Sequence, residues 1–136
     1  MSDIEKFLAE ANQFASIPTF SALVRFLESG IPQFPREPKL FVDLGQVYVQ
    51  AGDWQKALLY SSKAIELDAT NTDAWYNMGR CHLYRGDLQK ARESFIVALR
   101  HAPDDIEILD NLAMIEAELS LRSSPRASLV LCKLNS

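Results

Sequence analysis

Apolar residues follow a helical spacing in the stretch from residue 38 to residue 51. They recur at intervals of three and four positions and therefore share one helix face: Phe41, Leu44, Val47 and Tyr48. Gly52 can end this helix because glycine has no Cβ to oppose a left-handed backbone, and Asp53 can cap the next helix. A second apolar series follows and is broken at residues 68–71, which read DATN. The pattern predicts two antiparallel helices joined by a tight turn.

The same pattern returns 34 residues later, and the offset between the two copies never changes. The stretch GDWQKAL at residues 52–58 becomes GDLQKAR at residues 86–92. Further equivalent positions carry like residues, in the pairs Phe41/Trp75, Leu44/Met78, Gly45/Gly79 and Ala64/Ala98. A fixed period of this length indicates stacked helix pairs, so we expect an all-α solenoid with repeats at residues 38–71 and 72–105.

Gly45 and Gly79 lie in the middle of the predicted first helices, where glycine costs about 1 kcal/mol relative to alanine. We expect each of them to make room for a close neighbour on the second helix. That helix offers a low surface in both copies, through Ala57, Ala64, Ala91 and Ala98. Trp75 and Phe95 are expected to fill the remaining gaps.

Upstream, the register continues with weaker matches. Residues 4–37 form a predicted degenerate first repeat, whose matching positions are Phe7, Ala11, Phe14, Leu27, Gly30 and Pro35. Glu10 stands where the pattern expects leucine. Pro18 should interrupt this repeat, so that Ser16 or the proline itself starts its second helix.

Downstream, the register begins another repeat that it does not complete. A first helix is indicated by Leu109, Leu112 and Ala113, and Asp104 with Glu107 resembles a capping box at its start. Residues 106–136 are therefore expected to be an incomplete repeat with a C-terminal capping segment. Within it, residues 126–136 are either a short closing helix over the last apolar face or a frayed tail. The whole chain is then one domain, residues 1–136, of about three helix pairs plus a capping helix.

These positions resemble the tetratricopeptide repeat, whose signature is W-x2-L-G-x2-Y, then A-x3-F, A and P over 34 residues. The second copy carries Trp75, Met78, Gly79, Ala91, Phe95, Ala98 and Pro103. It departs from the signature at His82, where tyrosine is usual, and the first copy departs at Ser61 and Ala69. The resemblance implies a right-handed superhelix that binds other proteins, with the first helices on its concave surface.

Composition narrows the class of protein. The formal net charge of −4 and the lack of a basic stripe argue against nucleic-acid binding. The N-terminal stretch has no signal-peptide character, and no apolar window approaches a membrane span, so we expect a cytoplasmic protein without membrane contact. Cys81 and Cys132 are expected to be reduced thiols.

Candidate catalytic groups are poor, and we expect no enzyme. Cys81 and His82 are adjacent, so on a helix they point about 100° apart and cannot form a nucleophile–base pair. His82 is expected to be packed, and His101 to interact with a helix C-terminus. The four scattered Cys and His residues do not suit a metal, and no phosphate-binding loop is present, so we expect no metal and no cofactor.

The resemblance places the function on the first helices, in a concave groove. The groove residues it implies are Asn12, Lys39, Asp43, Gln46, Asp73, Tyr76, Asn77, Arg80, Glu107, Asp110, Asn111 and Met114, with Leu8 and Val42 beside them. Asp43, Asn77 and Asn111 share one repeat position and should form a polar ladder suited to a peptide backbone. Tyr76 and Met114 supply apolar anchors. The alternative is a solvated helix face without a ligand.

Some tetratricopeptide domains grip an acidic C-terminal chaperone tail with two lysines, two asparagines and an arginine. The corresponding residues in the first frame are Leu8, Asn12, Asp43, Asp73 and Asn77, and in the next frame Val42, Gln46, Asn77, Glu107 and Asn111. Both lysines and the arginine are missing, so we expect no binding of such tails.

The leading hypothesis is an adaptor, scaffold or assembly factor that holds a peptide of a partner protein. A self-associating protein, dimeric through the C-terminal segment, is a second hypothesis. A small dedicated chaperone for secreted or assembling subunits and a regulatory fragment of a larger enzyme stay open, as does the identity of the partner.

Overall fold

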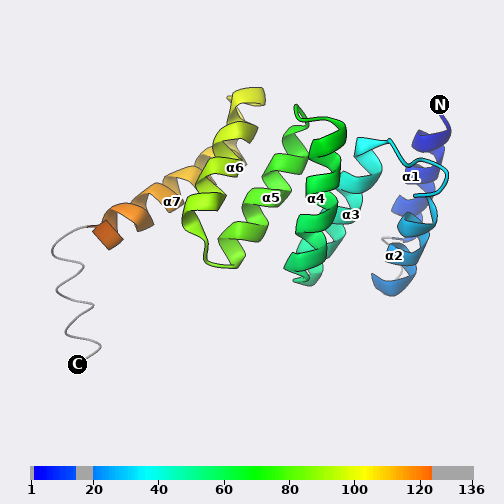
Figure 1. The fold of residues 1–136 in the computed structure, drawn as a ribbon, viewed down its shortest axis with the longest axis horizontal. Coiled ribbons are helices and arrows are strands. Elements are labelled where there is room, and N and C mark those ends of the chain that lie inside the picture. Colours follow the sequence, from blue (N-terminus) through cyan, green and yellow to red (C-terminus); the bar gives the residue numbers. More distant parts are fainter. Residues whose placement is uncertain (1, 15–19, 124–136) are drawn as a thin grey trace.

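The computed structural model describes residues 2–14 and 20–123, and every regular element in those ranges is a helix. The helices are α1 (Asp3–Phe14), α2 (Phe20–Ser29), α3 (Pro38–Ala51), α4 (Trp54–Leu67), α5 (Thr72–Tyr84), α6 (Leu88–His101) and α7 (Ile106–Ser123). They stand side by side in chain order, and successive helices run in opposite directions (Figure 1). The predicted all-α class is confirmed.

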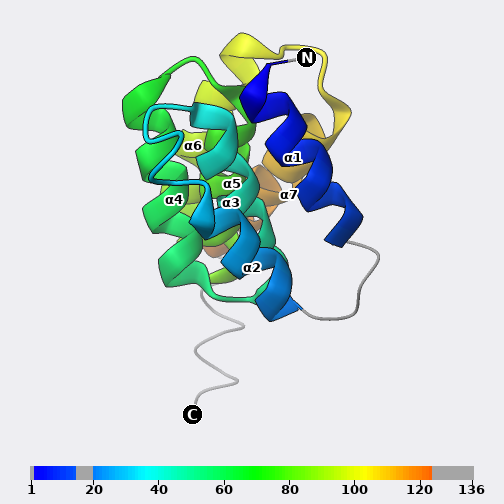
Figure 2. The same cartoon turned by 90° about the vertical axis from the view of Figure 1, so that its right-hand side faces the viewer.

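The helices pack as pairs, and the pairs stack on one another. α3 packs along α4, α5 packs along α6, and contacts of α4 and α3 with α5 join the two pairs. Figure 2 looks along the stack and shows α4 and α6 on one side, α1 and α7 on the other, and α3 and α5 between them. This arrangement confirms a solenoid of helix pairs.

The two tight turns are built as the sequence predicts. Gly52 and Gly86 adopt φ values of 78° and 83°, and no other described residue has a positive φ. Asp53 caps α4 and Asp87 caps α6, because each carboxylate accepts a hydrogen bond from the backbone N–H three residues later at 3.2 Å. The repeated GD pair is therefore an architectural turn.

The mid-helix glycines permit close helix packing, also as predicted. A Cβ on Gly79 would lie 2.8 Å from the ring of Phe95, and a Cβ on Gly45 would lie 2.9 Å from the hydroxyl of Ser61. Phe95 is completely buried, and so are the four alanines of the facing helices: Ala57, Ala64, Ala91 and Ala98. At its glycine, α5 thus packs onto the Phe95 ring of α6, whereas α3 packs onto the Ser61 hydroxyl of α4.

The upstream residues form the helix pair α1–α2, which is attached to the rest by a partly buried polar cluster. The Glu28 carboxylate accepts hydrogen bonds from the hydroxyls of Tyr48 at 2.8 Å and Tyr60 at 3.1 Å. The rings of Tyr48 and Tyr60 stack with centroids 5.7 Å apart. The prediction about Ser16 and Pro18 falls on residues 15–19, which lie outside the described residues.

The start of α7 differs by one residue from the prediction. The Asp105 carboxylate, not that of Asp104, accepts a hydrogen bond from the Ile108 N–H at 3.3 Å. The D-x-x-E spelling misled because two aspartates are adjacent, and Asp105 is the one that directly precedes α7 and so occupies the N-cap position. The predicted closing segment falls on residues 124–136, outside the described residues, and the division into repeats stays a prediction. None of the described helices is long and apolar enough to cross a membrane.

Candidate functional site

Seven of the twelve predicted groove residues line two cavities that share Gln46. The first, here called the α1–α3 cavity, has a volume of about 220 Å³ and is lined by Ala11, Asn12, Leu23, Leu27, Asp43, Gln46, Val47 and Gln50. The second, the α5–α7 cavity, has a volume of about 410 Å³ and is lined by Gln46, Tyr76, Arg80, Leu83, Tyr84, Glu107 and Asn111. All but two of these side chains come from the first helices of the pairs. The two cavities therefore adjoin at Gln46, and together they form the candidate site.

The α1–α3 cavity combines an apolar wall with one carboxylate and three amides. Asp43 is half-buried, and burial raises the pKa of its carboxyl to about 6. The nearby Lys39 ammonium lowers this pKa, and the Asp73 carboxylate on α5 raises it. A carboxylate that is costly to charge in the free protein gains most from an added cation. This cavity therefore favours a positively charged group.

The α5–α7 cavity is built around Arg80. Its guanidinium lies 5.8 Å from the ring centroid of Tyr76 and 5.9 Å from that of Tyr84, within cation–π range of both. The Tyr84 ring also stacks on Trp54, with centroids 4.9 Å apart. Burial raises the pKa of Tyr76, and the neighbouring Glu107 carboxylate raises it further. The cavity thus presents a fixed cation, aromatic edges and an acid on its far wall.

The predicted polar ladder of Asp43, Asn77 and Asn111 is not formed. Asn77 is only 3% exposed, and its amide donates a hydrogen bond to the Val42 carbonyl oxygen at 3.2 Å. Asn77 therefore joins α3 to α5 and presents no free amide to a partner, since buried polar groups need such a bond. The Asn111 amide donates to the Glu107 carbonyl oxygen within its own helix at 2.8 Å. Leu8 and Val42 are buried as well.

Four further predicted groove residues lie outside the cavity walls. They are exposed on the first helices: Lys39, Asp73, Asp110 and Met114. Lys39 and Asp73 still act on the site, because their charges shift the pKa of Asp43. Met114 is 53% exposed and lines neither cavity.

Several cavity residues escaped the sequence-based prediction. Tyr84 and Gln50 each lie four residues after a predicted groove residue, Arg80 and Gln46, and so share its helix face. The helical period could have found both. Leu83 directly precedes Tyr84 and Val47 directly follows Gln46, and both enter the walls through the way the helices pack.

The candidate catalytic residues lie in packed surroundings, as the sequence indicates. Cys81 is fully buried, and burial raises the pKa of its thiol to about 11. His82 is half-buried, and burial lowers the pKa of its imidazole. Among the described residues, no group of three or more His, Cys, Asp and Glu side chains is placed to hold a metal ion.

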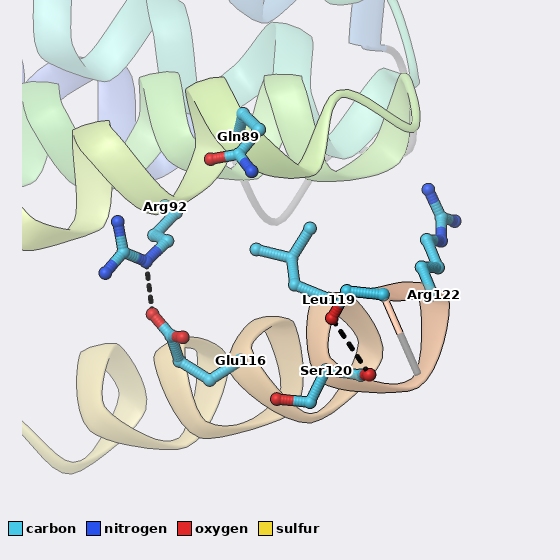
Figure 3. Close-up of a pocket in the computed structure, with 7 residues that line it drawn as sticks. Gln89, Arg92, Glu116, Leu119, Ser120 and Arg122 are labelled. Atoms are coloured by element: carbon cyan, nitrogen blue, oxygen red, sulfur yellow. Dashed lines mark hydrogen bonds and ion pairs between the residues drawn. The ribbon is translucent and has the colours of Figure 1, made fainter. Parts of the chain in front are cut away.

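A third cavity of about 500 Å³ lies away from the other two, between α6 and α7. Figure 3 shows Arg92 of α6 and Glu116 of α7 pointing toward one another across it, and the two form an ion pair. Arg122 pairs with Glu118 at 3.4 Å. Both guanidinium groups already have a carboxylate partner, so the cavity offers no unpaired guanidinium to a ligand. The Arg92–Glu116 ion pair links α6 to α7.

Comparisons with known proteins identify the pattern. The family model described as tetratricopeptide repeat matches residues 48–115. Tetratricopeptide repeat protein 8 of Caenorhabditis elegans is 33% identical over 94 residues, which cover 68% of this chain and 18% of that protein. Hsp70-Hsp90 organizing protein 2 of Arabidopsis thaliana is 24% identical over 103 residues, which cover 76% of this chain and 18% of that protein.

Solved structures show the same fold. The first TPR of Spaghetti (RPAP3), bound to the HSP90 peptide SRMEEVD, has a TM-score of 0.79 at 19% identity and covers 87% of this chain and 96% of its own. The Arabidopsis OM64 TPR domain has a TM-score of 0.79 at 16% identity, over 84% and 94% of the two chains. At these identities the likeness establishes the fold alone. The chain spans about 18% of the length of the two curated relatives.

Proposed function

This chain belongs to the tetratricopeptide repeat family, and we propose that it is a protein-interaction module that binds a peptide segment of a partner protein. The peptide lies across the α1–α3 and α5–α7 cavities, and the module serves as an adaptor, scaffold or assembly factor. Binding a chaperone peptide, as the RPAP3 domain does, is one form of this activity within the fold. Binding, not catalysis, is the proposed role.

One observation carries the proposal, namely that the two cavities adjoin, with Gln46 in the wall of both. An extended peptide needs a series of adjoining pockets for alternate side chains and polar groups for its backbone. The walls supply the amides of Asn12, Gln46 and Gln50 for the backbone and the rings of Tyr76 and Tyr84 as anchors.

We also propose that the partner is not an acidic C-terminal tail. The peptide in the RPAP3 complex, SRMEEVD, carries three acidic residues. Here, Asp43 and Asp73 occupy two of the positions at which tail-binding domains carry asparagine and lysine, and their charges repel such a peptide. Isothermal titration calorimetry with SRMEEVD should detect no binding at micromolar concentration. Micromolar affinity would overturn this part of the proposal.

Selection from a displayed library of random twelve-residue peptides tests the module directly. Selected peptides should bind the intact chain, and Tyr84→Ala and Arg80→Ala should each weaken them about tenfold, since each removes a cavity wall. Arg100→Ala is the matched control, because Arg100 is exposed on α6 and lines neither cavity. Asn77→Ala is unsuitable, because its loss disturbs the packing of α3 on α5. Peptides that bind equally well to all three variants would contradict the proposal.

Three expectations stay predictions. Self-association through the C-terminal segment falls on residues outside the described ranges, and light scattering over a dilution series tests it. A cytoplasmic location and the role of a dedicated chaperone are tested by tagging the protein in its cell of origin and identifying what co-purifies.

A further inference from the structure

We propose that the α1–α3 cavity binds a lysine or arginine side chain of the partner peptide, with the charged head at Asp43 and the aliphatic stem against the apolar wall. This inference rests on the proposed peptide-binding function and names the chemistry of one peptide position. It follows from the shape of the cavity, its two kinds of wall and the charge that lies at its rim.

The cavity has the size of one long side chain. Its volume is about 220 Å³, whereas a cavity of about 150 Å³ already accommodates a benzene molecule. A short polar side chain would leave much of this space unfilled. A single extended side chain fits.

One wall is apolar and suits a methylene stem. It consists of Ala11, Leu23, Leu27 and Val47, from three helices. Ala11 and Leu27 belong to the buried core, and Leu23 and Val47 pack against it, so this wall is firmly placed. Lysine and arginine are the charged residues that bury a long aliphatic stem while keeping the head in polar surroundings.

The same cavity also holds oxygen acceptors that lack partners of their own. Within the described ranges, Asp43 has no ion pair within 4.0 Å, and no recorded side-chain hydrogen bond uses the amides of Asn12, Gln46 or Gln50. Their carbonyl oxygens can accept from an ammonium or guanidinium group that a neutral side chain would not supply. Because Asp43 is half-buried, its hydrogen bond to a cation is stronger than one at an open surface.

The surrounding charges agree with a cationic guest. Asp73 on α5 adds a second negative charge near Asp43 and so strengthens the attraction of a cation. Lys39, one turn before Asp43 on α3, opposes it in part. An acidic guest would be repelled by Asp43 and by the nearby charge of Asp73, and a neutral guest would leave the half-buried Asp43 carboxylate without compensation.

The test combines selected peptides with a matched pair of variants. Twelve-residue random peptides are selected on the intact chain, and their consensus should contain one position enriched in lysine or arginine. In a synthetic peptide of that consensus, replacing arginine by citrulline or lysine by norleucine should weaken binding about tenfold or more. Asp43→Asn should remove this preference, whereas Asp104→Asn, with the same charge change on an exposed turn, should keep it.

Nuclear magnetic resonance locates the guest. The side-chain amide signals of Asn12, Gln46 and Gln50 should shift with the basic peptide and shift less with its neutral analogue. A consensus without a basic position, or an equal loss for basic and neutral peptides in Asp43→Asn, would overturn the inference while leaving peptide binding intact. Failure of any peptide to bind the two cavities would overturn the proposed function and this inference together.

Discussion

The helix pairs α3–α4 and α5–α6 share a 34-residue register but hold themselves together differently. In α5–α6, the space next to Gly79 is filled by the buried ring of Phe95, which also lies 5.7 Å from the ring of Tyr76. In α3–α4 the equivalent position is Ser61, whose buried hydroxyl has no hydrogen-bond partner among the described residues. A large aromatic side chain therefore fills the centre of the second pair, whereas a small hydroxyl side chain stands at the equivalent position of the first.

The first pair instead forms hydrogen bonds with a carboxylate of the preceding helix, α2. The stacked rings of Tyr48 and Tyr60 both donate to Glu28 of α2. The equivalent residues in the second pair are His82 and Ser94, and no such carboxylate bridge is recorded there. The polar bridge thus ties α2 to the α3–α4 pair, in which Ser61 stands at the position that Phe95 fills in the second pair.

Truncating Phe95 is expected to change the free energy of unfolding most, and it therefore tests the difference between the two pairs most strongly. Phe95→Ala should lower the free energy of unfolding by about 3–5 kcal/mol, because a fully buried ring is lost and a cavity remains. Ser61→Ala at the equivalent position should instead raise it by about 1 kcal/mol, since an unpaired buried hydroxyl is removed. Urea unfolding followed by circular dichroism measures both, and equal destabilisation by the two variants would contradict the comparison.

The two mid-helix glycines give a second matched pair. Gly79→Ala should destabilise by about 1–3 kcal/mol, because the new methyl would overlap a buried ring that has no room to move. Gly45→Ala should be close to neutral, since the Ser61 hydroxyl can rotate away and alanine favours the helix by about 1 kcal/mol. Urea unfolding measures both variants. A loss of unfolding free energy for Gly45→Ala as large as that for Gly79→Ala would show that α3 and α4 are as tightly packed as α5 and α6.

Removing the bridge tests the dependence of the first pair on α2. Glu28→Ala should lower the free energy of unfolding by about 1–2 kcal/mol, because two tyrosine hydroxyls lose a charged acceptor. Hydrogen exchange followed by mass spectrometry should show faster exchange in α1 and α2 with little change in α5 and α6. Tyr48→Phe and Tyr60→Phe should each produce part of the effect, and both should become nearly silent in the Glu28→Ala background.

Short-range rules were enough to predict the helix pairs and their turns. Gly52, Asp53 and their copies act through contacts with residues close to them in the sequence. The local sequence is therefore enough to predict the turn and the helix cap. The groove residues, in contrast, were implied by the family resemblance, and seven of the twelve line the cavities.

Long-range contacts account for what the sequence did not reveal. Asn77 is engaged by a carbonyl 35 residues away, and Glu28 by hydroxyls 20 and 32 residues away. A repeat register treats equivalent positions alike and cannot tell that Asn77 turns into a helix interface while Asp43 turns toward a cavity. The distinction depends on how closely neighbouring pairs approach.

Asp43 and Asn77 are equivalent positions, so the substitution Asp43→Asn gives the first pair the residue of the second. The pKa of the Asp43 carboxyl is raised to about 6 from 3.8 by burial, and the folded protein therefore binds a proton more tightly than the unfolded chain. Its contribution to stability is fully present below pH 3.8 and is lost as pH rises through about 6. Between pH 3.8 and about pH 6, the free energy of unfolding should fall less for Asp43→Asn than for the wild type.

At pH 7 the variant should be more stable by about 1 kcal/mol, since a shift of two units corresponds to about 3 kcal/mol before its reduction by partial solvent exposure. Urea unfolding from pH 4 to 7 measures the difference, with Asp104→Asn as the control for net charge. The nearby charges of Lys39 and Asp73 are unchanged in both variants. The reverse substitution, Asn77→Asp, should destabilise at pH 7, because a buried carboxylate would face the Val42 carbonyl oxygen instead of donating to it. Opposite signs for the two exchanges are expected if one repeat position lines a cavity in the first pair and a helix interface in the second.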